Sequence, residues 1–76
     1  MSRRRNFGDV VVLIDEDEGA YRARILKPET GRGFDLCPYE CGDSQCREWW
    51  TLEVVGAPGE YVYHVPECEM SDVSDQ

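Results

Sequence analysis

Four cysteines and a single histidine are the residues of this 76-residue chain that are best suited to hold a metal ion. Thiolates and imidazoles are the soft ligands that Zn²⁺ prefers, and four of them complete a tetrahedral structural site. The candidate ligands are Cys37, Cys41, Cys46 and Cys68, with His64 as an alternative ligand. A structural zinc is therefore a candidate cofactor, which would tie the cysteine-rich segment to the last part of the chain.

The spacing of the cysteines leaves other interpretations open. Three residues separate Cys37 from Cys41 and four separate Cys41 from Cys46, so neither pair has the C-x2-C spacing of common zinc sites. The cysteines could equally be small buried apolar side chains or free thiols. Disulfides would require an oxidising compartment. A thiol switch is disfavoured because acidic neighbours, here Glu40 and Asp43, raise the pKa of a thiol.

Enzymatic activity is the class that the sequence favours least. Nucleophilic catalysis requires a Cys or Ser beside an imidazole, and the only histidine, His64, lies in a segment with the pattern of a strand. The chain has no glycine-rich phosphate loop, and its 16 acidic residues make chance carboxylate pairs inevitable. We therefore expect a protein that is not an enzyme.

Acidic residues are distributed unevenly along the chain. The formal net charge is −8, and residues 48–76 hold seven acidic residues and no basic one. Such a surface repels nucleic acid and anionic membranes, so we expect a protein partner with a basic surface rather than direct nucleic-acid binding. The longest apolar run, residues 10–14, is far shorter than the roughly 20 residues of a membrane span. A cytoplasmic location is expected.

Two segments near the N-terminus are expected to form strands. Residues 10–14 are a run of β-branched and apolar side chains bounded by turn-forming residues. Residues 20–26 alternate between apolar and arginine side chains, which is typical of a half-buried strand. The acidic residues 15–19 between them predict a turn.

The second half of the chain predicts a hairpin. In residues 48–55 the side chains alternate, so one face is expected to enter the core and the other to point outward. The core face holds Trp50, Leu52 and Val54, and the outward face holds Trp49, Thr51 and Glu53. Residues 56–59 predict a turn, and residues 60–65 predict the partner strand. Trp49 is then either exposed or covered by the cysteine-rich segment.

Aromatic side chains outside the core are the candidate partner-binding residues, because aromatic residues dominate the energetics of protein interfaces. The candidates, with one acidic neighbour, are Tyr21, Trp49, Glu53, Tyr61 and Tyr63. Among so many acids they would suit a basic, partly apolar partner. An exposed strand edge beside Trp49 could also pair two copies, so the sequence is compatible with a monomer or a homodimer.

The sequence predicts one small domain with flexible ends. Residues 1–7 are expected to form a basic arm, residues 8–70 a single β domain, and residues 71–76 an acidic disordered tail. Within the domain, residues 27–46 are rich in Pro, Gly and Cys and predict a long loop, and loops of that length are usually functional, cross-linked or disordered. A short helical turn could form at residues 66–70.

The Gly-Asp-Val of residues 8–10, the acidic turn and the Ala-Tyr-Arg-Ala-Arg-Ile of residues 20–25 resemble the small barrels of the Src-homology and Tudor type. Tyr21-Arg22-Ala23 is similar to the Tyr-Arg-Ala of many Tudor domains. The resemblance implies an all-β fold, a small Src-homology-like (Tudor-like) barrel of about five short strands, to which this chain adds a long cysteine-rich loop that has no counterpart in the Tudor pattern. It implies a scaffold for binding, but Ala20 stands where Tudor domains often have a ligand-caging aromatic residue, so methyl-ligand recognition is not implied.

These patterns favour a non-enzymatic protein-interaction module, a small adaptor or regulator that docks a partner through an acidic face bearing aromatic side chains. One alternative is an acidic nucleic-acid mimic that inhibits a DNA- or RNA-binding protein. A more distant alternative is a thiol redox or metal-handling protein. Salt distinguishes the first two, because contacts between charges are screened by salt whereas aromatic contacts are not.

Overall fold

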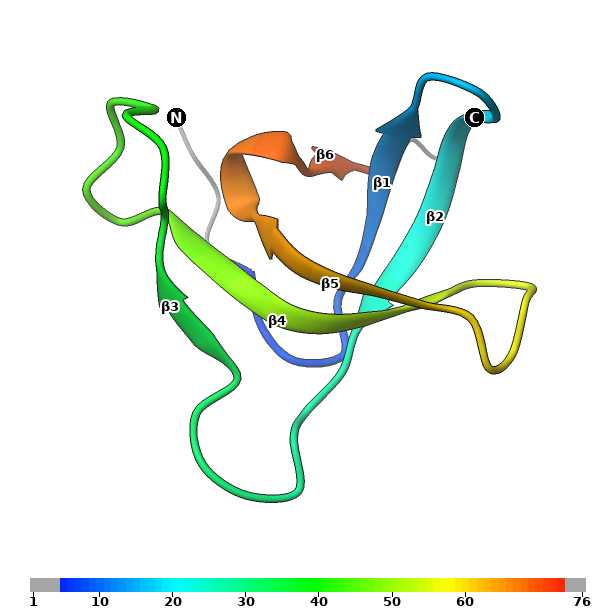
Figure 1. Cartoon of the computed structure of the whole chain (residues 1–76), viewed down its shortest axis with the longest axis horizontal. Coiled ribbons are helices and arrows are strands. Elements are labelled where there is room, and N and C mark those ends of the chain that lie inside the picture. The colour runs from blue at the N-terminus through cyan, green and yellow to red at the C-terminus, as the bar shows by residue number, and fades with distance from the viewer. Residues whose placement is uncertain (1–4, 74–76) are drawn as a thin grey trace.

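The computed structural model describes residues 5–73, and its regular secondary structure consists almost entirely of β-strands (Figure 1). The strands are β1 (Val10–Asp15), β2 (Gly19–Ile25), β3 (Phe34–Leu36), β4 (Arg47–Val54), β5 (Tyr61–Pro66) and β6 (Ser71–Asp72). A single 3₁₀ helix, η1 (Glu67–Glu69), connects β5 to β6. The predicted all-β class, the four longer strands and the helical turn near residues 66–70 are confirmed.

The six strands form one antiparallel sheet. Two hairpins, β1–β2 and β4–β5, are joined by pairing of β2 with the C-terminal half of β4. The first half of β4 pairs with β3, a strand that lies inside the predicted loop of residues 27–46. Since β6 pairs with β1, the order of pairing is β5–β4–β2–β1–β6. The two ends of this order follow one another in the chain, and η1 turns the chain back toward β1 (Figure 1).

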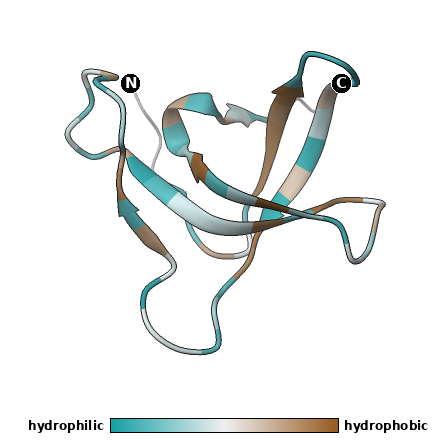
Figure 2. Cartoon of the chain, in the orientation of Figure 1, coloured by the Kyte–Doolittle hydropathy of each residue, from teal (hydrophilic) through white to brown (hydrophobic). Residues whose placement is uncertain are grey.

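The hydrophobic core lies on one face of the sheet, where buried side chains from neighbouring strands contact one another. Its buried residues are Val11, Leu13, Ala23, Ile25, Trp49, Leu52, Val65 and Met70. In an antiparallel pair, directly opposed residues point to the same face, and the register sets Val11 opposite Ala23 and Ile25 opposite Leu52. β1 is coloured hydrophobic along most of its length (Figure 2), in agreement with its β-branched sequence.

The alternation of β4 and β5 is interrupted at the same point in both strands. The register pairs Trp49 with Val65, skips Trp50 and His64, and then resumes. His64 has a positive φ of 56°, which is uncommon for a residue other than glycine and departs from regular strand geometry. Two consecutive residues in β4, Trp50 and Thr51, therefore separate the buried Trp49 from the buried Leu52.

The prediction that Trp50 faces the core and Trp49 points outward is therefore wrong. Trp49, expected on the outward face, is 4% exposed, whereas Trp50 is half-buried and outside the core. Leu52 does lie in the core, as expected. The prediction assumed strict alternation through residues 48–55, and the interruption opposite His64 shifts the alternation by one residue.

Trp49 is covered by two aromatic side chains from different segments. The ring of Phe7 meets it edge-on at 5.1 Å between centroids, and the ring of Phe34 lies at 5.0 Å. Its indole Nε1–H donates a hydrogen bond of 2.8 Å to Glu67 in η1. Phe34 lies in the predicted loop of residues 27–46, so this loop does contribute to the cover of Trp49.

Residues beyond both ends of the expected domain, residues 8–70, contact that domain. Phe7 packs against the core, and the side chain of Arg5 is 9% exposed and forms an ion pair with Asp72 of β6. The remainder of the predicted arm and tail, residues 1–4 and 74–76, lies outside the described residues. Between residues 5 and 73 no helix has the length and the apolar character needed to cross a membrane.

Candidate metal centre

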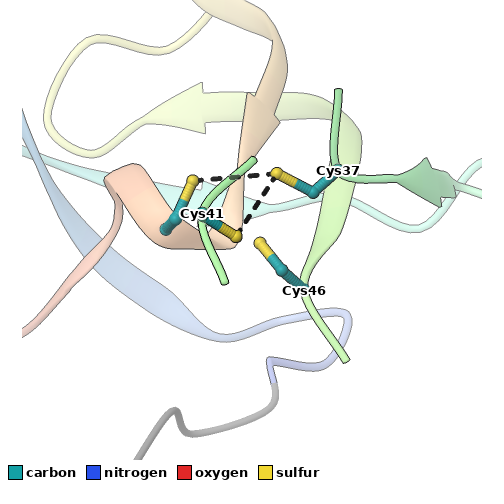
Figure 3. Close-up of side chains that lie close together, drawn as sticks. Cys37, Cys41 and Cys46 are labelled. Atoms are coloured by element: carbon teal, nitrogen blue, oxygen red, sulfur yellow. Dashed lines mark hydrogen bonds between the residues drawn. The ribbon is translucent and has the colours of Figure 1, made fainter. Parts of the chain in front are cut away.

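All four cysteine sulfurs converge on one point of the structure. Cys37 follows β3, Cys41 lies in the loop between β3 and β4, Cys46 precedes β4, and Cys68 lies in η1. Their Sγ atoms all lie within 4.8 Å of one another. The Cys37 sulfur is 3.8 Å from that of Cys41 and 3.8 Å from that of Cys68. Figure 3 shows the side chains of Cys37, Cys41 and Cys46 pointing toward one another.

These distances fit a tetrahedral metal site better than a disulfide. A zinc ion bound by four thiolates has Zn–S bonds of about 2.3 Å, which places sulfurs about 3.8 Å apart in a regular tetrahedron. A disulfide requires sulfurs at about 2.05 Å, and all four cysteines are free thiols in the structure. The donor set and its spacing are therefore compatible with a structural metal ion.

Pairing of β3 with β4 brings Cys37 beside Cys46. The last pair of this ladder is Leu36 with Arg47. Cys37 follows Leu36 in the chain and Cys46 precedes Arg47, so the two cysteines stand side by side just beyond this pair. The Cys37 N–H donates to the carbonyl of Cys46 at 3.4 Å, which extends the ladder by one bond. The loop of residues 38–45 then folds back, so that Cys41 reaches the same point.

An aspartate holds the turn before Cys46. The Asp43 carboxylate accepts the N–H of Gln45 at 2.9 Å, and the Asp43 carbonyl accepts the N–H of Cys46 at 3.1 Å. This short local turn is of the kind that Asp side chains stabilise. The loop of residues 38–45 is thus fixed by backbone and side-chain hydrogen bonds next to two of the cysteines.

The four thiols differ in burial and in acidity. Cys46 is buried, Cys37 is half-buried, and Cys41 and Cys68 are exposed. Burial raises the pKa of Cys46, and desolvation around the sulfur raises the pKa of Cys68 to about 11, although that residue as a whole is exposed. A backbone hydrogen bond with Asp43 lowers the pKa of Cys41. Because a metal ion binds thiolates, its charge would oppose the raised pKa values.

His64 does not join the cysteines. Its Nδ1 atom lies 3.2 Å from a carboxylate oxygen of Glu48 on the neighbouring strand, and its side chain is 62% exposed. The metal-ligand group found among residues 5–73 contains only the four cysteines. Of the ligands considered from the sequence, the structure therefore brings together the four thiols and leaves the alternative imidazole elsewhere.

The predicted partner-binding residues separate into two groups. Trp49 is buried in the core and is not available to a partner. Tyr61 and Tyr63 on β5 are 45% and 62% exposed, and their ring centroids lie 6.4 Å apart. Glu53 stands opposite Tyr61 across the β4–β5 ladder. Tyr21 is half-buried in the turn-proximal part of β2.

Tyr21 and Tyr61 line one hollow of about 210 Å³ at the surface. Three carboxylate residues, Asp15, Glu18 and Glu60, line the same hollow. Desolvation raises the pKa of Tyr21, and the charges of Asp15 and Glu18 raise it further. Tyr21 also borders a second hollow of about 370 Å³, whose apolar walls come from β1 and β5.

Sequence reasoning missed one residue beside the candidate metal centre, Glu67. It immediately precedes Cys68, and its carboxylate accepts the N–H of Arg47, which immediately follows Cys46. In a chain with 16 acidic residues, one more Glu beside a cysteine carries little information. The only available clue was its position in the expected helical turn at residues 66–70.

No family model, curated protein or solved structure matches this chain.

Proposed function

We propose that this chain is a non-enzymatic protein-interaction module, a small adaptor or regulator that docks a basic, partly apolar segment of a partner. The observation that carries the proposal is the hollow between the β1–β2 turn and β5, where two tyrosine rings and three carboxylates meet. A partner's Lys or Arg could pack its aliphatic stem on the rings while its cationic group meets the carboxylates. The net charge of −8 would attract such a partner.

A small barrel of the Src-homology or Tudor type is the architecture that we propose for this module. The two ends of the strand order, β5 and β6, are joined by one turn of 3₁₀ helix, which favours a sheet that curls on itself. Pairing of the short last strand with the first supports the same architecture. The added strand β3 and residues 37–46, here called the cysteine loop, would be an insertion between the second strand and the hairpin.

Zinc is the metal that we propose for the four cysteines. Cys37, Cys41, Cys46 and Cys68 would each supply one thiolate, and a closed set of four thiolates suits a structural rather than a catalytic ion. The ion would join the β3–β4 loop to η1, whose nearest cysteines in the sequence, Cys46 and Cys68, are 22 positions apart. In this proposal zinc braces the fold, and the tyrosine-lined surface does the binding.

The test is a pull-down from the host, followed by affinity measurements between the purified partner and matched variants. We expect Tyr61→Ala to weaken binding roughly 30-fold, the size of an interface hot spot. Tyr39→Ala is the control, because Tyr39 is an exposed tyrosine of the cysteine loop and does not line the hollow. Equal affinity of both variants and the wild type would contradict the proposal.

An acidic nucleic-acid mimic is the second candidate function. It is favoured by one observation: residues 48–76 carry seven acidic residues and no basic one. In this case the partner would be a DNA- or RNA-binding protein that high salt releases and that binds Tyr61→Ala as well as it binds the wild type. The same measurements at low and high salt therefore separate the two functions.

A further inference from the structure

Glu67 is a half-buried carboxylate with three N–H donors around it. Its Oε2 atom accepts hydrogen bonds from the indole Nε1–H of Trp49 at 2.8 Å and from the backbone N–H of Arg5 at 3.1 Å. Its Oε1 atom accepts the backbone N–H of Arg47 at 3.2 Å. Hydrogen bonds to an ionised acceptor are stronger than those between neutral groups, so this carboxylate fixes the start of η1 firmly.

The donors come from two distant parts of the chain, residue 5 and residues 47–49, and one of them adjoins the candidate metal centre. Arg47 directly follows Cys46, and Glu67 directly precedes Cys68. The Arg47–Glu67 hydrogen bond thus joins the backbone next to one cysteine to the side chain next to another. This hydrogen bond links the residues that flank Cys46 and Cys68, the two consecutive cysteines that are farthest apart in the sequence.

The same carboxylate connects the metal centre to the hydrophobic core. Trp49 is buried against Phe7 and Phe34, and Glu67 is the acceptor for its indole N–H. A shift of η1 that moved Cys68 would therefore also disturb the partner of a buried polar group, which is costly. The position of Cys68 and the packing of Trp49 depend on one side chain.

We propose that Glu67 is a positioning residue of the metal centre: it holds Cys68 within reach of Cys37 and Cys46 and transmits metal binding to Trp49. This inference rests on the proposed zinc site. Residues that orient metal ligands typically contribute about 10- to 100-fold to metal affinity. Glu67 does so here through the backbone of η1 rather than by contact with a ligand's side chain.

The test compares Glu67→Gln with Glu69→Gln in the full chain. Both substitutions remove one negative charge from η1, but Glu69 is exposed and borders the larger hollow instead of the N–H donors of Glu67. Competition with a chromogenic chelator measures zinc affinity, and the visible spectrum of the Co²⁺-loaded protein reports ligand geometry. The indole N–H signal of Trp49 in ¹⁵N-labelled protein reports the coupling to the core.

We expect Glu67→Gln to bind zinc about 10- to 100-fold more weakly than the wild type and to give an altered Co²⁺ spectrum. Glu69→Gln should match the wild type in both measurements. The Trp49 indole signal should shift on addition of zinc in the wild type and in Glu69→Gln, and much less in Glu67→Gln. A purely structural role would lower stability without changing the shape of the Co²⁺ spectrum.

Two results would overturn the inference, and they are distinguishable. If Glu67→Gln and Glu69→Gln bind zinc equally and give the same Co²⁺ spectrum, Glu67 does not position a ligand, and the zinc site itself stands. If the wild type binds neither zinc nor Co²⁺, the proposed metal site fails and the role of Glu67 fails with it.

Discussion

Two side chains, one in the candidate metal centre and one in the tyrosine-lined hollow, lie in surroundings that disfavour their ionisation. Burial raises the pKa of the Cys46 thiol, and desolvation together with Asp15 and Glu18 raises the pKa of the Tyr21 hydroxyl. For the thiol, a bound cation would reverse the effect. For Tyr21 the neutral phenol remains favoured, which keeps a hydrogen-bond donor available beside the carboxylates of the hollow.

The raised pKa of Tyr21 predicts a loss of stability in alkaline solution. In the unfolded chain the phenol ionises near its ordinary value of about 10. In the folded chain the phenol keeps its proton to higher pH. The contribution of Tyr21 to the free energy of unfolding is therefore fully present below the unfolded-state pKa and is lost as the pH rises through the raised pKa of the folded state. Urea unfolding should show the free energy of unfolding of the wild type falling more steeply above pH 10 than that of Tyr21→Phe. Parallel curves for the two proteins would contradict this.

At the scale of elements, β4 and β5 determine which side chains reach the core and which remain at the surface. The interruption opposite His64 buries Trp49 and leaves Tyr63 exposed. The sequence predicted the strands themselves, because β-branched and aromatic runs bounded by turn formers are local features. It did not predict the interruption, because the positive φ of His64 depends on the tertiary context and no glycine marks it. For the same reason β3, three residues long and stabilised by pairing with β4, was expected to be loop.

The orientation of β4 predicts unequal effects of substitution at its two tryptophans. Trp49→Phe removes the indole donor to Glu67 and part of a buried ring, so it should lower the free energy of unfolding by roughly 2 kcal/mol. Trp50→Phe removes a hydrogen bond of 2.8 Å to Asp35, but at a half-buried position, and should cost less than half as much. Urea unfolding of the two variants measures the difference. A larger loss at Trp50 would contradict the observed orientation and agree with strict alternation.

At the scale of the whole molecule, the chain is short and its core is small. A domain of about this size buries only about 60% of the surface that its unfolded chain exposes, so natural domains of similar length often carry a metal or a disulfide. The buried cluster on the sheet contains eight hydrophobic residues, and the cysteine loop adds only Cys46 to the buried set. The residue types of the candidate metal centre were predictable, because four soft ligands stand out in any sequence. Their convergence was not, since it depends on β3 pairing and on η1.

Removal of the proposed zinc ion should therefore destabilise the entire chain rather than the cysteine loop alone. The proposed ion joins the β3–β4 loop to η1, and η1 is bonded through Glu67 to Trp49 in the core. For a domain of this length, 1 kcal/mol corresponds to about 4–8 °C in Tm, so the loss of a structural zinc should lower Tm by more than about 10 °C. Calorimetry with and without a strong chelator measures the shift, and metal analysis of freshly purified protein gives the zinc content.

Cys68→Ser is the matched control, because a chain that lacks one thiolate should already melt at the lower temperature and respond little to the chelator. A zinc-free protein whose Tm is unaffected by chelator and by Cys68→Ser would instead assign the four thiols to packing or to redox chemistry.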